Sequence, residues 1–260
     1  MEQITVLGSS GAVAGADRDN VSLVFTSGEF HVLIECGGSA AHKLARIGVP
    51  YETLEDVIIT HTHLDHFYGL PGLIFSMRYR DQSRTTPLRI YCPEPSIPAI
   101  ERVFDAYGLL DGCFFPLEFH GIAVHEQAQV LDNDQVTITA TPVAHAPDLP
   151  TLGMHIHSKV SGKDLVYSSD TGPSDNLVRL AQGVDVLLHE CAGVSSHPIP
   201  ELHSNAAQVG RVARQTGVQR LILLHLDMVC NDAPEDIIAE VRQEFSGTVH
   251  VAADFEVYQL

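Results

Sequence analysis

Basic side chains are scarce in this sequence. Its 260 residues include 15 Lys and Arg against 33 Asp and Glu, which gives a formal net charge of −18. A chain this acidic repels a phosphate backbone unless its basic groups are clustered, and no Lys/Arg cluster is visible. The composition therefore argues against a nucleic-acid-binding surface. A small phosphorylated substrate remains compatible, because bound divalent cations can reverse the local charge of a site.

Long apolar runs and paired cysteines are also missing. The chain has no run of the roughly 18 apolar residues that a membrane-spanning helix needs, and its strand-like start at 4–7 has no charged leader before an apolar stretch. The cysteines form an odd set without a C-x-x-C pair, which argues against a disulfide framework and a thiolate zinc site. We expect a soluble, cytoplasmic protein with no membrane contact and with buried thiols at Cys36, Cys92, Cys113, Cys191 and Cys230.

Short β-branched segments recur along the chain, and helical patterns lie between them. Two packed sheets with helices outside would bury both kinds of apolar face, so we predict an α/β (α+β) fold with four αββα layers. No repeat or flexible linker marks a boundary, and 45% hydrophobic residues suffice for a sizeable core, so residues 1–260 are predicted to form a single domain. The predicted strands are 4–7, 21–25, 31–35, 57–60, 88–92, 136–140, 165–169, 184–189, 221–224 and 249–252, and the predicted helices are 40–47, 66–78, 97–106, 174–181, 204–216 and 234–245.

The strongest chemical feature is the segment 61–66, with the sequence His-Thr-His-Leu-Asp-His. It lies between an apolar strand and a predicted helix, and it holds four potential metal ligands. Imidazoles and carboxylates suit zinc and other borderline divalent metals, and a turn at a strand end can direct alternate side chains towards two adjacent ions. We expect His61 and His63 to bind one metal, and Asp65 and His66 to bind a second.

Two metals need further ligands, and three later strand ends supply them. His145, Asp170 and His225 each follow an apolar run, where loops gather to form sites. A carboxylate such as Asp170 can bridge ions roughly 3.5–4 Å apart, and a hydroxide that the two ions share could attack an ester without a protein nucleophile. The sequence has no G-x-S-x-G elbow, which weakens a serine-hydrolase interpretation.

Together these motifs resemble the ribonuclease Z branch of the metallo-β-lactamase superfamily over nearly the whole chain. The turn at 7–13 (L-G-S-S-G-A-V) and the strand end at 34–38 (I-E-C-G-G) are similar to that branch's glycine turn and D-C-G-E-G segment, and 61–66 with Gly-Leu-Pro-Gly at 69–72 matches its helix entry. The resemblance implies a four-layer αββα metallo-β-lactamase sandwich. The metal ligands that it implies are His61, His63, Asp65, His66, His145, Asp170 and His225.

A further part of the resemblance concerns proton transfer. Leu-His-Glu-Cys at 188–191 and His-Ser-Asn-Ala-Ala at 203–207 are similar to the branch's H-E-A-T segment and its downstream histidine. By that resemblance Glu190 orients His203, which donates a proton to the leaving oxygen. A carboxylate partner would keep a histidine charged and aimed, which suits this role. The candidate catalytic residues are thus Asp65, Glu190 and His203.

The chain departs from the transfer-RNA-processing members in one respect. They carry a long RNA-gripping arm between the third histidine motif and the bridging aspartate, and here only residues 146–169 separate His145 from Asp170. With the charge of −18, this argues against transfer RNA as the substrate. We expect a dinuclear metal-dependent phosphodiesterase that acts on a small phosphodiester, with cyclic mononucleotides as the leading candidates.

Other hypotheses remain open at this point. The same metals could serve a ribonuclease Z-type RNA endonuclease, an arylsulfatase-like enzyme, or a lactonase or thioesterase, and the site could belong to a non-catalytic metal-binding sensor. Zinc fits the histidine-rich ligand set, while manganese, iron or cobalt could occupy the same ligands. The resemblance also implies a homodimer.

Overall fold

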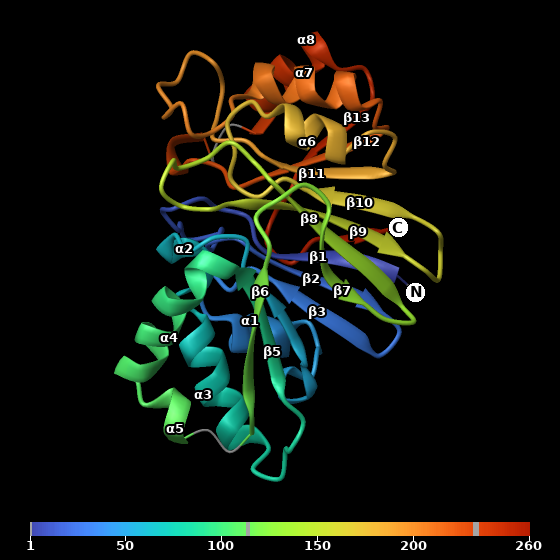
Figure 1. Ribbon diagram of the computed structural model, residues 1–260. Helices are drawn as coiled ribbons and strands as arrows, with labels where there is room; N and C mark the ends of the chain where they lie inside the picture. The colour runs from blue at the N-terminus through green and yellow to red at the C-terminus, as the bar shows by residue number, and fades with distance from the viewer. Residues whose placement is uncertain (1, 113–114, 231–233) are drawn as a thin grey trace.

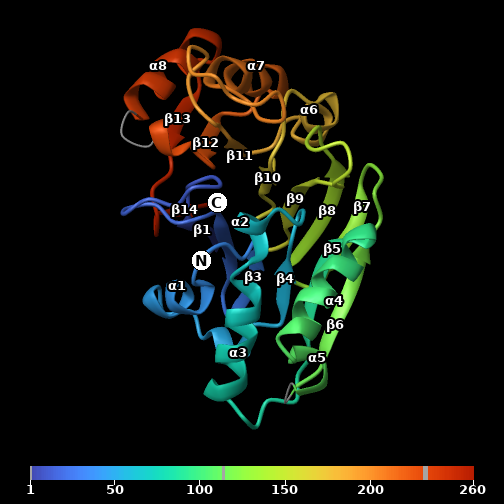
Figure 2. The same cartoon turned by 90° about the vertical axis from the view of Figure 1, so that its left-hand side faces the viewer.

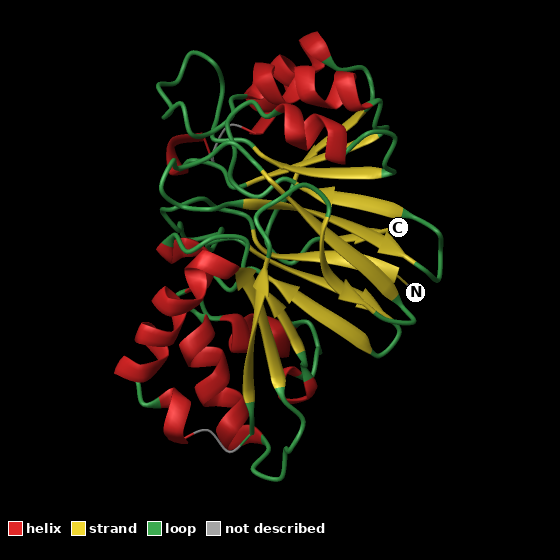
Figure 3. Ribbon diagram, in the orientation of Figure 1, coloured by secondary structure: helices red, strands yellow, loops and turns green. Residues whose placement is uncertain are grey.

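Two β-sheets pack face to face and carry helices on their outer faces (Figures 1 and 3). The structure is a computed structural model that describes residues 2–112, 115–230 and 234–260. Cys113 lies outside the described residues, and Cys36, Cys92, Cys191 and Cys230 are free and buried. Within the described residues, no helix is both long and apolar enough to cross a membrane.

The first sheet combines an antiparallel half with a parallel half. Strands β14, β1, β2 and β3 pair antiparallel, and β3, β4, β5 and β6 pair parallel. In spatial order the strands are β14 (Val257–Gln259), β1 (Glu2–Gly8), β2 (Ser22–Ser27), β3 (Phe30–Ile34), β4 (Asp56–Ile58), β5 (Leu88–Pro93) and β6 (Leu117–Ile122).

The second sheet has the same mixed character. Strands β13, β12, β11 and β10 pair parallel, and β10, β9, β8 and β7 pair antiparallel. In spatial order the strands are β13 (Thr248–Val251), β12 (Arg220–Leu224), β11 (Val186–Glu190), β10 (Asp164–Tyr167), β9 (Leu152–Ser158), β8 (Val136–Pro142) and β7 (Ala128–Asp132).

Helices cover the outer face of each sheet, as Figure 2 shows from a second direction. Over the first sheet lie α1 (Ala40–Arg46), α3 (Leu70–Arg80), α4 (Ile97–Ala106) and α5 (Leu109–Gly112), and over the second lie α6 (Asp175–Leu180), α7 (Ala206–Thr216) and α8 (Pro234–Glu244). The short α2 (Leu64–Phe67) lies between the two layers of helices, and the 3₁₀ turns are η1 (Tyr51–Thr53), η2 (Glu94–Ser96) and η3 (Met228–Cys230).

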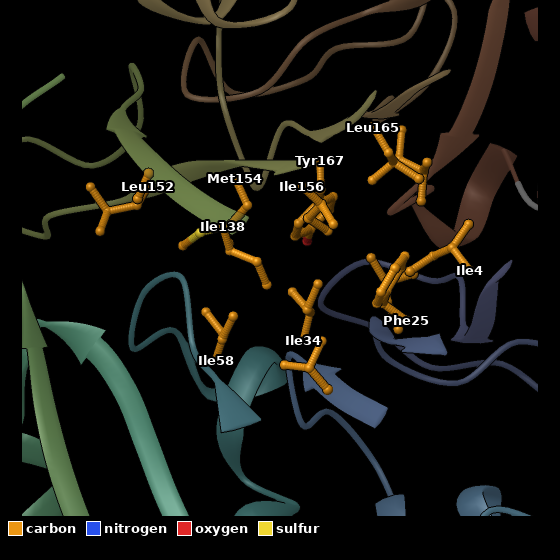
Figure 4. Close-up of a cluster of buried hydrophobic side chains, with 14 of the residues drawn as sticks. Ile4, Phe25, Ile34, Ile58, Ile138, Leu152, Met154, Ile156, Leu165 and Tyr167 are labelled. Carbon is orange, nitrogen blue, oxygen red and sulfur yellow. The ribbon is translucent and has the colours of Figure 1, made fainter. Parts of the chain in front are cut away.

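Alternating side chains explain why four layers form. In β3, Val32 and Ile34 pack between the sheets, whereas Leu33 faces the first helical layer. In β11, Leu188 packs between the sheets and Leu187 faces α6, α7 and α8. Strands that are apolar on both faces need cover on both sides. Figure 4 shows the inter-sheet cluster, which includes Ile4, Phe25, Ile34, Ile58, Ile138, Leu152, Met154, Ile156, Leu165 and Tyr167. The predicted αββα fold is confirmed.

The predicted helix 66–78 is wrong in one respect, because two helices take its place. Helix α2 ends at Phe67, and α3 begins at Leu70. At the break, N of Gly69 donates to O of Cys36 at 2.9 Å, and a Cβ at Gly69 would lie 2.0 Å from O of Gly38. The close approach of two backbone segments thus divides the helix and fixes the segment 61–66 against the end of β3.

Candidate metal centre

All seven predicted metal ligands lie together at one edge of the two sheets. This edge is the left side of Figure 1, beside α2. Parallel strands direct their carboxyl ends to the same edge, so the loops that follow β4, β10 and β12 converge there. The ligands come from the turn before α2 and from α2 itself, and from the loops after β8, β10 and β12: His61, His63, Asp65, His66, His145, Asp170 and His225.

One group of ligands consists of His61, His63, His145 and Asp170. One ligand atom of each lies within 4.8 Å of the others. Nε2 of His145 is 3.0 Å from Nδ1 of His63, and Nε2 of His61 is 3.7 Å from Oδ2 of Asp170. Three imidazoles and one carboxylate oxygen are a donor set that zinc accepts in tetrahedral sites.

A second group consists of Asp65, His66 and His225, which again approach within 4.8 Å. Nε2 of His225 is 3.4 Å from Oδ2 of Asp65 and 3.2 Å from Oδ1 of Asp170. The other oxygen of Asp170, Oδ2, lies 3.3 Å from Nε2 of His66. Because Oδ2 of Asp170 is also 3.7 Å from Nε2 of His61 in the first group, the carboxylate faces both groups, as a bridging ligand must.

The ligand set fits divalent cations on its own chemistry. Nε2 of His61 is buried and has no hydrogen-bond partner among the described residues, which is unfavourable unless another ligand occupies that direction. Burial lowers the pKa of His61, His63 and His145, so these imidazoles are neutral and can coordinate. Burial alone would lower the pKa of His66 as well, but Asp170 and Glu35 raise it well above its ordinary value. A cation at the second group would replace that proton.

Backbone strain is concentrated at this centre. Glu35, Ser169 and His225 have φ values of 61°, 56° and 57°, in the left-handed region that non-glycine residues rarely adopt. Each such residue costs about 1–3 kcal/mol, so surrounding contacts must hold it in place. Strain at the ends of β3, β10 and β12 turns the chain where the ligand side chains enter the site.

Groups behind the ligands fix their orientation. Nδ1 of His145 is 3.0 Å from O of Leu202, which leaves Nε2 available to a metal. Oε1 of the fully buried Glu35 lies 3.3 Å from Nδ1 of His66, and Glu35 also accepts a hydrogen bond from Oγ1 of Thr60. Oγ1 of Thr60 is in turn 2.6 Å from Oγ of Ser169. The sequence analysis assigned no role to Glu35, Thr60 or Ser169. The available signal was Glu35 itself, an acidic residue at a strand end within the segment 34–38 that resembles the D-C-G-E-G motif.

The predicted proton-donor pair lies beside the ligands. Nδ1 of His203 donates to Oε1 of Glu190 at 2.9 Å, and the ring of His203 stacks on that of His225 at a centroid distance of 5.5 Å. Burial alone would lower the pKa of His203, but the hydrogen bond and charge of Glu190 raise it to about 9. Helix α7 begins at Ala206 with Asn205 as its N-cap, two residues later than predicted, so His203 stands in the loop before the helix and faces the site.

Comparison with known proteins places this architecture in a family. A family profile described as "Anti-Pycsar protein Apyc1" matches residues 2–243. The chain belongs to the Apyc1 family. An uncharacterized protein of Mycobacterium tuberculosis is 34% identical over 99% of this chain and 92% of its own length. A ribonuclease Z of Mycobacterium bovis is 30% identical over 98% of this chain and 96% of its own.

A solved structure shows the same fold. The metallo-β-lactamase fold protein YhfI from Bacillus subtilis superimposes with a TM-score of 0.83 at 25% identity and covers 99% of this Apyc1-family chain and 98% of its own. The predicted membership of the ribonuclease Z-like branch is confirmed. The chain thus combines a metallo-hydrolase fold with a His/Asp cluster suited to divalent metals.

Proposed function

We propose that the protein is a metal-dependent phosphodiesterase that acts on small phosphodiesters, with cyclic mononucleotides as the leading substrates. The observation that carries the proposal is the Glu190–His203 pair, which lies beside the ligand cluster. An alkoxide leaving group needs a proton, and a histidine held charged by a buried carboxylate can donate it. A thioester would need this donor less, because a thiolate leaves unprotonated.

The residues of the chain divide the work between binding and proton transfer. One cation would be held by His61, His63 and His145, and a second by Asp65, His66 and His225. The carboxylate of Asp170 would contribute to both sites. When bound, the cations supply charge stabilisation for the phosphoryl oxygens and activate the attacking water. Oε1 of Glu190 holds Nδ1 of His203, which leaves Nε2–H as the proton donor to the departing oxygen. Glu190 also accepts a hydrogen bond from N of Thr171 at 2.9 Å, which fixes its carboxylate.

Small substrates are favoured over transfer RNA by the segment between His145 and Asp170. Within residues 146–169 a short loop leads into the hairpin of β9 and β10 in the second sheet, which leaves no room for an arm. Several arginines are also paired with carboxylates, as Arg179 is with Glu126 at 2.8 Å, and are less available to a phosphate backbone.

The proposal also includes the identity of the metal, the cellular location and the oligomeric state. We propose zinc as the resident metal, with manganese as an alternative, because imidazoles dominate both ligand groups. We propose a cytoplasmic homodimer, which size-exclusion chromatography with light scattering tests for its oligomeric part. A mass of one chain, 28.3 kDa, would contradict the dimer.

Hydrolysis assays test the proposed activity. We would measure turnover of bis-para-nitrophenyl phosphate and of a panel of cyclic mononucleotides, with zinc or manganese added. We expect the wild type to hydrolyse them, His63→Ala to lose activity, and His157→Ala to keep it. His157 is a suitable control because it lies on β9 outside both ligand groups and pairs with Asp164 at 2.9 Å. A metal-loaded wild type that hydrolyses no phosphodiester contradicts the proposal and favours sulfate esters, lactones or thioesters.

A further inference from the structure

A cavity of about 180 Å³ adjoins the proposed proton donor. His203 and His225 line it together with the apolar residues Ala12, Val13, Pro200 and Met228. A cavity of roughly 150 Å³ with apolar walls can hold a benzene ring, so this one is large enough for a single ring. Val13 and Met228 are 52% and 50% exposed, and a ring between them would remove apolar surface from water.

Backbone contacts hold one wall of the cavity in place. N of Gly11 donates to O of Leu226 at 2.9 Å, and Oγ of Ser10 donates to O of Val13 at 2.8 Å. Nδ2 of the buried Asn20 donates to O of Gly11 at 2.5 Å. A Cβ at Gly11 would lie 3.1 Å from Cε1 of His225. The glycine turn therefore lets the backbone lie directly against a predicted metal ligand, and it presents Val13 at a fixed distance from the site.

The part of the lining that contains Pro200 is tied to the proton donor. N of His203 donates to O of Pro200 at 3.1 Å, so the loop that carries His203 also carries this part of the lining. A further part of the lining contains Ala192, Asp227 and Met228. N of Asp227 donates to O of Ala192 at 3.1 Å, and Met228 follows in η3. Asp227 also lines the cavity, and Oδ2 of its carboxylate is 3.5 Å from Nε2 of His197. Apart from this residue and the two histidines the lining is apolar, so the cavity is suited to an uncharged group.

We infer that this cavity is the subsite for an uncharged planar ring, such as a nucleobase or aryl group, carried by the leaving side of the substrate. The inference rests on the proposed function, because His203 must face the leaving oxygen. Whatever that oxygen carries can then enter the cavity that His203 lines together with Val13 and Met228. These two residues determine preference for a ring and take no part in proton transfer.

Binding of two phosphonates to the zinc-loaded protein tests the subsite without turnover. Phenylphosphonate carries a ring and methylphosphonate does not, and calorimetry gives the affinity for each. We expect wild type to bind phenylphosphonate about tenfold more tightly, since burying a ring of this size contributes at least that much. The double variant Val13→Ala/Met228→Ala should lose the preference and keep its affinity for methylphosphonate. Val160→Ala is the matched control, because Val160 is 62% exposed and lies in the turn between β9 and β10.

The outcomes separate this inference from the proposed function. A wild type that binds neither phosphonate or shows no preference for the ring, or a double variant that keeps the preference, overturns the subsite. Unchanged methylphosphonate affinity in the double variant shows that its fold and metal centre are intact. If the ring preference behaves as expected but cyclic mononucleotides are not hydrolysed, the subsite stands and the phosphodiesterase proposal fails. If they are hydrolysed without any ring preference, the reverse holds.

Discussion

Replacing Glu190 by glutamine tests the proton donor with a minimal change. The carboxylate of Glu190 is fully buried, and its Oε1 accepts hydrogen bonds from Nδ1 of His203 and N of Thr171, both at 2.9 Å. A glutamine has the same shape, and its amide oxygen can accept both bonds. The substitution therefore removes one negative charge while the position of His203 is kept.

The charge of Glu190 sets the pH range in which His203 is protonated. Burial opposes protonation, but Glu190, Asp170 and Asp65 together raise the pKa of His203 from 6.5 to about 9. This difference corresponds to about 3 kcal/mol in favour of the imidazolium. Asp170 and Asp65 remain in the variant, and bound cations oppose them, so we expect the pKa to fall by about one to two units in Glu190→Gln.

The pH dependence of kcat/KM for a cyclic mononucleotide measures this change. His203 must be protonated to act as an acid, so activity is present below its pKa and is lost as the pH rises through it. We expect the alkaline limb to begin about one to two pH units lower in Glu190→Gln. His203→Ala should lose roughly 10²- to 10⁴-fold at pH values below the pKa of His203, where the wild type has its proton donor in place.

The leaving group supplies an internal control. Para-nitrophenolate is a good leaving group and needs little protonation, so bis-para-nitrophenyl phosphate should show a much smaller change in both variants. An alkaline limb that stays in place in Glu190→Gln, or equal losses on the two substrates in His203→Ala, would refute the assignment of His203 as proton donor to the leaving oxygen.

Three other predictions concern the metal centre and the core. Removal of bound metal by a chelator should lower Tm by several degrees, and added zinc should restore it. The reason is that a ligand at 100 times its Kd stabilises the folded state by about 2.7 kcal/mol. A Tm that does not change in calorimetry would contradict metal binding by the folded state. Glu35→Gln should weaken zinc binding about tenfold in a chelator competition, because Glu35 orients His66, whereas an unchanged affinity would assign Glu35 a purely structural role. Burial lowers the pKa of His189 to about 4, so the stability that the neutral imidazole contributes is complete above pH 6.5 and is lost as the pH falls towards 4. Between pH 7 and pH 5, denaturant titrations should show that the unfolding free energy of the wild type falls by about 2 kcal/mol more than that of His189→Gln.

Local spacing was enough to predict much of the site. His61, His63, Asp65 and His66 lie within one strand-to-helix turn, so their proximity follows from short-range geometry. His145, Asp170 and His225 could be predicted because each follows an apolar strand and the ends of parallel strands meet at one edge. These three are held together by sheet packing, and the four candidate ligands at 61–66 were the reason to rank them above other polar residues in turns.

Some strands gave too weak a pattern to be predicted. Strands β6, β7 and β14 lie at the edges of the two sheets, and their side chains are largely half-buried or exposed, so they lack the apolar alternation of the central strands. Only their pairing with neighbouring strands in the folded structure identifies them as strands. The division of the predicted helix 66–78 into α2 and α3 likewise depends on the contact of Gly69 with Cys36 and Gly38, which lie about 30 positions earlier in the chain.

The sequence by itself determined the ligand types, the αββα layering and the family, because these depend on residue chemistry, periodicity and local motifs. Only the tertiary structure decided that Asp170 faces both ligand groups, that Glu35 lies behind His66, and that Val13 and Met228 line a cavity beside His203. Each of these contacts joins segments far apart in the chain. Their distances are set by how the two sheets pack and where strained turns direct the backbone, which no local pattern encodes.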